Sequence, residues 1–204
     1  MPGMISLLEP NPAVLGMFER FGEWAEVVRR EEIETKRLDD IPETAQLDLL
    51  KIDIQGAELM VFQNATERLR TAVVIHTEVE FLEMYHGQPL FGDVEKFLRG
   101  HGYVLHQFAP LVTRDFRPVL LGSDPYVGHS QVMWADAIFV RDFAKLEKLT
   151  AEQLLRMAVI LHDCYRSFDL VLLLLREHDR RTQQGYGARY AELVRPIMNF
   201  PSDA

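Results

Sequence analysis

The sequence predicts an α/β fold with a mostly parallel sheet, an antiparallel edge and a group of helices after the sheet. Up to about residue 108, short apolar runs alternate with amphipathic helical segments, which is the pattern of βαβ units. The last two predicted strands are joined by a Pro-, Gly- and Asp-rich segment without helical periodicity, so we expect them to pair antiparallel. From Thr150 onward the periodicity is helical only.

The predicted strands are short runs of apolar and β-branched residues, at 4–8, 25–28, 47–54, 72–80, 103–108 and 132–140. The first helix begins at Asn11, a good N-cap, with Pro12 at its first position and apolar residues up to Phe21. Further helices are expected at 59–69, 90–98, 150–165 and 168–181. We expect an α/β domain at 1–145 and a helical extension at 146–204.

Composition limits the classes of function. The chain has 204 residues, 48% of them apolar, and a formal charge of −9, so it can bury a core and disfavours nucleic-acid partners. Cys164, the single cysteine, fits a reducing compartment and is expected to be buried in a helix. The first residues do not form a signal peptide, and no apolar run is long enough for a membrane span. The sequence therefore predicts a cytoplasmic protein.

Acidic residues close three of the predicted strands. Glu9 follows the first run, Asp53 lies at the end of LDLLKID, and Glu78 with Glu80 closes AVVIHTEVE. Ligands of open α/β sheets bind beyond the carboxyl ends of the strands, so these carboxylates predict a ligand crevice. Glu9 suits the hydroxyls of a ribose, although an acid near a helix N-terminus is also favoured by the helix dipole alone.

The turn after Asp53 contains Gly56, which allows a tight turn or a close backbone approach to a ligand. Lys51 alternates with apolar neighbours and shares a face with Asp53, so a structural ion pair of Lys51 with an adjacent acid is expected. His76 lies in a strand beside the acidic end and is the histidine that is a candidate for a functional role. None of the seven histidines belongs to a ligand cluster, so no metal site is predicted.

Several motifs resemble the FkbM-type methyltransferases, which use S-adenosylmethionine and have a Rossmann-like class I fold. The most specific of them is KIDIQGAE within residues 49–59. The others are LEPNP at 8–12, RLDDI at 37–41, VVIHTEVEF at 73–81, YHGQPLFGDVEKFLRGHGY at 85–103 and WADAIFVRDF at 134–143. The resemblance covers about residues 5–108.

The resemblance implies roles for individual residues. Glu9 matches the acid that holds the cofactor ribose, with Asn11 in the same motif, and Asp39 and Asp40 match the segment before the KID strand. Asp53 and Gly56 match the motif that lines the cofactor and substrate crevice, and Glu58 follows it. The candidate bases for the acceptor hydroxyl are Asp53 and Glu78, with His76 behind them.

The family implies O-methylation of a hydroxyl, often on a sugar or a secondary metabolite. Family members normally begin with a strand and a glycine-rich turn, for which the residues before Glu9 leave no room. A fragment, a late start and a lost unit all account for this. The expected sheet lacks the first βα unit, so either the strand at 4–8 pairs directly with the KID strand or another chain completes the sheet. The alternative to an enzyme is a degenerate, non-catalytic module that acts in assembly or glycan-pathway scaffolding. The apolar run 170–175 surrounds its helix, so it is either buried within the chain or part of a homo-oligomer interface.

Overall fold

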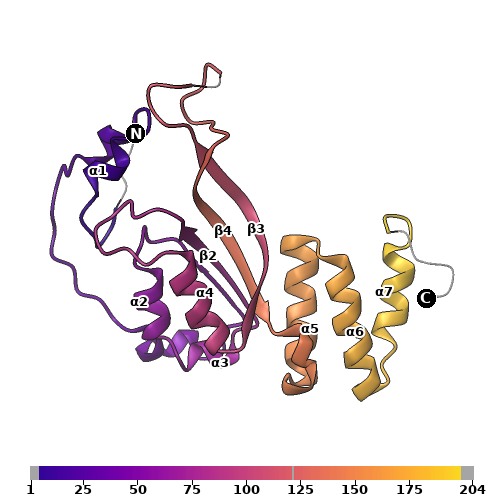
Figure 1. The fold of residues 1–204 in the computed structure, drawn as a ribbon. Helices are drawn as coiled ribbons and strands as arrows, with labels where there is room; N and C mark the ends of the chain where they lie inside the picture. Colours follow the sequence, from indigo (N-terminus) through magenta and orange to yellow (C-terminus); the bar gives the residue numbers. More distant parts are fainter. Residues whose placement is uncertain (1–4, 121, 199–204) are drawn as a thin grey trace. The chain divides into compact units, whose positions relative to one another are not determined.

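The structure is a computed structural model that describes residues 5–120 and 122–198 (Figure 1). The chain divides into two compact units, Met1–Phe139 and Val140–Ala204. The first unit contains the sheet and the helices that lie between its strands in sequence, and the second is helical. At the level of class, the chain has the predicted α/β fold.

The sheet has four strands in the order β1-β2-β4-β3. Their bounds are Leu49–Ile52 for β1, Val74–Glu80 for β2, Tyr103–Arg114 for β3 and Gln131–Arg141 for β4. β1 and β2 are parallel, with Lys51 opposite His76. β3 and β4 form a long hairpin closed by the 115–130 loop, so the sheet is mixed, with the expected antiparallel part (Figure 1).

The helices of the first unit are short. They are α1 (Pro12–Leu15), α2 (Glu58–Gln63), α3 (Arg68–Thr71) and α4 (Phe91–Gly100), together with 3-10 turns at Phe21–Ala25, Leu38–Asp40 and Pro42–Thr44. α2, α3 and α4 cover one face of the sheet, and Phe62, Leu69 and Leu98 are fully buried there (Figure 1). This core fixes which strand residues face the helices.

The opposite face of the sheet carries the polar residues. Ile52, Ile75 and Val79 belong to the core under the helices, so the residues that alternate with them point to the other side. On β2 this second set includes His76, Glu78 and Glu80. The strand period therefore brings Asp53, directly after β1, and the glutamates of β2 to one face, at the carboxyl ends of both strands.

The N-terminal segment differs from the prediction. Residues 5–8 form no strand and do not pair with β1; Pro10 forms an isolated bridge with Tyr85 instead. Residues 25–28 form no strand either, and the first helix ends at Leu15. β1 is an end strand of the sheet, and among the described residues nothing pairs with its outer edge. An apolar run becomes a strand only where a neighbouring strand completes its hydrogen bonds. Residues 5–8 lack such a neighbour within the described part of the chain.

The second unit consists of α5 (Ala151–Ile160), α6 (Phe168–Thr182) and α7 (Tyr186–Val194), with a π-helical turn at Leu161–Tyr165 and a 3-10 segment at Phe143–Lys148. The predicted start of a helix at residue 150 is confirmed, and Thr150 caps α5, because its side chain accepts from the backbone N–H of Gln153. α7 was not predicted. Cys164 is exposed in the π-helical turn, so the expectation of a buried thiol was wrong.

The apolar run on α6 is mostly internal to the second unit. Of residues 170–175, only Leu173 is exposed, at 46%. Within the described part of the chain, no helix has both the length and the apolar character needed to cross a bilayer.

Candidate active site

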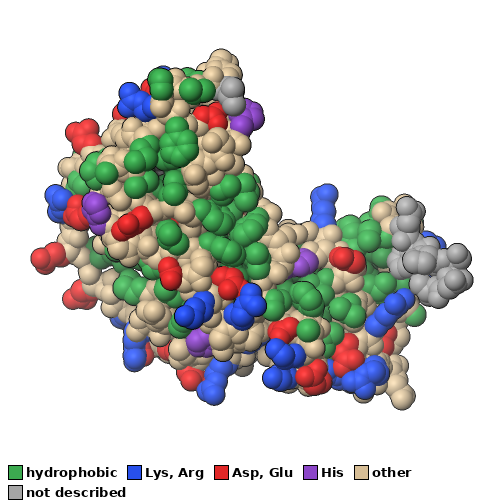
Figure 2. Space-filling view, in the orientation of Figure 1, with side chains coloured by type: hydrophobic (Ala, Val, Ile, Leu, Met, Phe, Trp, Pro, Cys, Tyr) green, Lys and Arg blue, Asp and Glu red, His purple; other side chains and the backbone are tan. Residues whose placement is uncertain are grey.

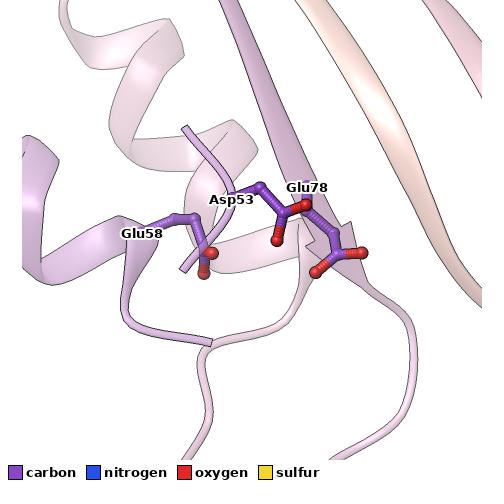
Figure 3. Close-up of side chains that lie close together, drawn as sticks. All are labelled: Asp53, Glu58 and Glu78. Carbon is purple, nitrogen blue, oxygen red and sulfur yellow. The ribbon is translucent and has the colours of Figure 1, made fainter. Parts of the chain in front are cut away.

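Three carboxylates meet at the carboxyl ends of β1 and β2. Asp53 directly follows β1, Glu78 lies near the end of β2, and Glu58 is the first residue of α2. One oxygen of each lies within 4.8 Å of the others, and Figure 3 shows the three carboxylates gathered in one place. Glu58 and Glu78 are buried, whereas Asp53 is exposed, so the cluster has a buried back and an open front.

The loop between β1 and α2 holds Glu58 in this position. Its two carboxylate oxygens accept the backbone N–H groups of Ile54, at 2.7 Å, and Gly56, at 2.9 Å. Gln55 and Gly56 have φ of 59° and 102°, both in the left-handed region. That region favours glycine, and a Cβ on Gly56 would lie 2.6 Å from Nε2 of Gln88. A glycine is therefore required where the sequence predicted a tight turn.

The Gln55 side chain links the carboxylates to one another. Its Nε2 donates to Oδ1 of Asp53, at 3.0 Å, and to Oε2 of Glu78, at 2.8 Å. Its Oε1 accepts a hydrogen bond of 3.2 Å from the buried hydroxyl of Tyr85. The amide and the phenol thus form a continuous hydrogen-bonded chain with two of the three acids.

The electrostatics of the cluster are those of crowded acids. Burial, together with the charges of Asp53 and Glu58, raises the pKa of Glu78 to about 8. Burial also raises the pKa of Glu58, and the same cause raises the pKa of Tyr85 to about 12. Within the described residues no Lys, Arg or His forms an ion pair with Asp53, Glu58 or Glu78.

Glu80 is the last residue of β2, two residues beyond Glu78. It shares a face of β2 with Glu78 and is 2% exposed, and its Oε1 has no hydrogen-bond donor among the described residues. Burial and then the charge of Glu58, followed by Glu78, raise the pKa of Glu80 to about 9. A buried carboxylate oxygen without a hydrogen-bond donor costs free energy, and the raised pKa means that Glu80 is uncharged at neutral pH.

His76 precedes Glu78 by two residues on β2, and Lys51 of β1 precedes Asp53 by two residues. Nε2 of His76 is 3.3 Å from Oδ2 of Asp136 on β4, and the imidazole is largely buried. Lys51 is exposed and forms no ion pair with the acids, so the predicted structural pair was wrong. Because β1 is an end strand, the lysine reaches water and needs no partner.

Glu9 does not belong to the cluster of carboxylates. Its side chain is exposed and is held by Arg30, whose Nε and terminal nitrogen donate at 3.0 and 2.8 Å, and this hydrogen bond lowers the pKa of Glu9. The backbone of Glu9 nonetheless accepts from the N–H of His86, next to Tyr85. Asn11 caps α1 through Val14 and donates to the carbonyl of Glu83.

Asp39 and Asp40 lie near the start of β2 rather than its end. The carboxylate of Asp39 accepts the N–H groups of Glu67 and Arg68, at the beginning of α3, which leads into β2. Asp40 pairs with Arg37 at the surface, and that hydrogen bond lowers its pKa. Their assignment to the cofactor stays a prediction, and these contacts have a structural explanation.

A cavity of about 270 Å³ adjoins the loop of the site. Its lining is mainly apolar and comes from the segment before Glu9, the start of α2 and the turn before α4, namely Leu7, Leu8, Gly56, Ala57, Met60, Gly87 and Pro89. The segment before Glu9 is tied to the loop, because Oγ of Ser6 donates to the carbonyl of Gln55 at 2.7 Å. The site therefore combines charged and apolar surfaces.

The face of the molecule shown in Figure 2 carries no basic patch. Among the side chains drawn there in colour, Lys and Arg lie interspersed with Asp and Glu. The chain as a whole has a net charge of −9.

Sequence reasoning found Asp53, Glu78 and Gly56 but missed the residues that connect them. The contacts of Gln55 with two acids arise from its left-handed backbone, which nothing in a one-dimensional pattern indicates. Tyr85 and Gln88 were seen only as part of a motif. Oε1 of Gln88 accepts the N–H groups of Met84 and Tyr85, so this side chain fixes the turn that carries the phenol.

Comparison with protein families gives one match. Residues 7–105 match the model of the methyltransferase FkbM domain, and this region contains the whole carboxylate cluster. No curated protein and no solved structure was found to match the chain. The expected resemblance is thus confirmed over residues 7–105, which match the FkbM methyltransferase domain.

Proposed function

We propose that this domain transfers a methyl group from S-adenosylmethionine to a hydroxyl of a small-molecule acceptor, with a sugar or a secondary metabolite as the acceptor class. The family match supports methyl transfer in general. The observation that carries the finer proposal is the chain of Tyr85, Gln55, Glu78 and Asp53 at the carboxyl ends of two parallel strands. We further propose that the sheet belongs to a Rossmann-like class I fold, with β1 and β2 as parallel strands of it.

Asp53 and Glu78 are the carboxylates that supply the base for this reaction. The acceptor oxygen forms the new bond to the methyl carbon as the bond from that carbon to sulfur breaks, and the hydroxyl proton passes to a carboxylate. A base works best when its pKa lies near the working pH, and the pKa of Glu78 is raised to about 8. Asp53 is exposed at the open front, where an acceptor can reach it, and His76 lies behind on the same face of β2.

Some of the predicted cofactor residues suit S-adenosylmethionine as they lie in the structure, and others are engaged in other contacts. S-adenosylmethionine, when bound, supplies an electrophilic methyl group. Gly56 and the adjoining apolar cavity suit a nucleoside, because Gly56 allows close approach and the cavity offers apolar contacts. Glu9 would have to leave Arg30 to hold a ribose, whereas Asn11, Asp39 and Asp40 already serve as caps or partners of backbone groups and Arg37.

Calorimetric titration of the full chain with S-adenosylmethionine tests the proposal. Saturable heat is expected, and Asp53→Asn should weaken binding or, in a methyl-transfer assay, lower turnover by about 100-fold if Asp53 is the base. Glu67→Gln, an exposed acid paired with Arg70, is the matched control. A titration without heat would reject a self-sufficient enzyme.

One observation favours the alternative of a non-catalytic module. The outer edge of β1 is unpaired among the described residues, and an open edge is a template for another strand. A module that assembles through this edge would sediment as an oligomer. Saturable cofactor binding by a monomer would favour the enzyme instead.

A further inference from the structure

Both candidate bases accept a hydrogen bond from the same side chain. The amide nitrogen of Gln55 donates to Oδ1 of Asp53, at 3.0 Å, and to Oε2 of Glu78, at 2.8 Å. A primary amide has two hydrogens to donate, so these two contacts use both of them. Hydrogen bonds donated to a carboxylate favour its charged form, which is the form that accepts a proton.

The hydroxyl of Tyr85 holds the Gln55 amide in this orientation. It donates to Oε1 of Gln55 at 3.2 Å, so the acceptor of the amide has its own partner and the two donors are left for the acids. The opposite orientation would turn Oε1 toward the oxygens of two carboxylates. Tyr85 is 3% exposed, so water has little access to the place that its hydroxyl occupies.

The turn that carries Tyr85 is fixed against the loop that carries Gln55. Oε1 of Gln88 accepts the N–H groups of Met84 and Tyr85, at 3.0 and 3.2 Å. The carboxamide of Gln88 also lies against Gly56, where an added Cβ would be 2.6 Å from Nε2. The distance between the phenol and the amide is therefore set by the packing of two loops as well as by their own hydrogen bond.

We propose that Gln55 and Tyr85 are positioning residues of the site. Together they hold two N–H donors on the carboxylates of Asp53 and Glu78, which favours the charged forms that can accept a proton. These hydrogen bonds do not depend on methyl transfer, but their consequence for catalysis rests on the proposed function. Without the donors, each carboxyl group would keep its proton to a higher pH, and less of the base would be available near neutral pH.

The charges around Glu78 stay the same in the test. Among the described residues, the titratable groups that act on Glu78 or feel its charge are Asp53, Glu58, Tyr85, Glu80 and Asp136. Lys51, two residues before Asp53, and His76, two residues before Glu78, are basic side chains on the same face. Burial above all raises the pKa of Tyr85 to about 12, so the phenol is uncharged over the range of the test. Substitution of Tyr85 or Gln55 by an uncharged residue therefore changes hydrogen bonds and no charge.

A carbon-13 NMR titration of the Glu78 carboxyl group in the full chain tests the proposal, with Glu78→Gln used to assign the signal. Gln55→Met keeps the length of the side chain but removes both donors, so it should raise the pKa of Glu78 by about 1. Tyr85→Phe removes only the oxygen that holds the amide, and it should raise the pKa by a smaller amount. In a methyl-transfer assay, the acid limb of the pH profile of kcat/KM should move upward in the same order.

Tyr103→Phe is the matched control. The buried hydroxyl of Tyr103 donates to the carbonyls of Leu69 and Ala72, at the end of α3 that leads into the start of β2. Its loss should lower stability and leave the pKa of Glu78 unchanged, so a general loss of stability does not give the expected result. Circular dichroism checks the fold of each variant, and Tyr85→Phe, which deletes a single oxygen, decides the test if Gln55→Met does not fold.

An unchanged or lower pKa of Glu78 in Gln55→Met would overturn the role of the amide, and the same result in Tyr85→Phe would overturn the role of the phenol. An equal rise in Tyr103→Phe would overturn both, because the effect would then be one of stability. The carboxyl titration needs no cofactor. Its outcome is therefore separate from that of the calorimetric titration with S-adenosylmethionine, which tests the proposed function.

Discussion

Glutamates in the two units of this chain have opposite electrostatic surroundings. In the helical unit, Glu177 on α6 accepts hydrogen bonds from Arg180 and Arg181, which lower its pKa to about 2. At the end of β2, burial and neighbouring acids raise the pKa of Glu78 to about 8 and that of Glu80 to about 9. Charge in the helices is matched within the unit, whereas charge at the end of the sheet is not. The difference teaches that hydrogen bonds from arginine stabilise the charged form of Glu177, whereas burial disfavours the charged forms of Glu78 and Glu80.

The largest expected effect is that of Glu80→Gln on stability at high pH. An acid with a raised pKa stabilises the fold at low pH, and this contribution is lost as pH rises from the unfolded pKa of about 4.5 toward about 9. Urea unfolding in a chelator should show a stability that falls from pH 5 to pH 9, and the variant should be more stable at pH 9 by roughly 3 kcal/mol. An unchanged slope in the variant would contradict this, and Glu67→Gln should behave as the wild type.

Removal of a charge from the helical unit should lower the free energy of unfolding, whereas Glu80→Gln should raise it at high pH. Arg181 donates to Glu177 and also to the carbonyls of Leu146 and Leu149, so it joins α6 to the segment before α5. Arg181→Ala leaves these acceptors without donors and should destabilise by about 2 kcal/mol in denaturant unfolding. Arg180→Ala loses only a surface pair, so an equal loss in both variants would argue against the special role of Arg181.

A glycine-to-alanine substitution is expected to lower stability more in the loop between β1 and α2 than in helix α4. Gly56→Ala places a Cβ at a φ of 102° and 2.6 Å from Nε2 of Gln88, which should cost about 1–3 kcal/mol. Gly92→Ala on α4, where a Cβ meets nothing within 4 Å, should be neutral or stabilise by up to about 1 kcal/mol. Thermal unfolding of the two variants measures the difference, and similar melting temperatures would contradict the geometry of the loop.

The smallest expected effect is that of Glu177→Gln. A lowered pKa contributes stability above about pH 4.5, and this contribution is lost as pH falls toward about 2. Since the arginines of this pair lie partly in water, the loss at pH 7 should be only about 0.5 kcal/mol. Unfolding at pH 7 and pH 3 measures it, and a loss that grows at pH 3 would contradict the sign.

Much of the fold could be predicted because its strongest patterns are local. The runs that became β2 and β4, the stripe that became α4 and the capping box of α5 each carry their own signal. Residues 5–8 and 25–28 failed as strands because a strand depends on a partner that the run itself does not specify. α7 was missed although Tyr186, Tyr190 and Val194 repeat at helical spacing, so its signal was present.

The site was predictable in its parts but not in its connections. Asp53 and Glu78 follow parallel strands, and the strand period places them on one face. The prediction of Glu9 as their neighbour depended on a paired N-terminal strand, and that strand is not formed in the described residues 5–8. The bridge by Gln55 depends on a left-handed turn, which is a property of three dimensions only.

Chemical-shift mapping with ¹⁵N-labelled protein and S-adenosylhomocysteine, the product of methyl transfer, tests the central claim most directly. The account predicts shifts in the amides of 7–8, 53–60 and 84–88, around Gln55, Tyr85 and the adjoining cavity, with α5–α7 unaffected. Shifts confined to the helical unit, or no shifts at saturating ligand, would contradict the assignment of the site to the ends of β1 and β2.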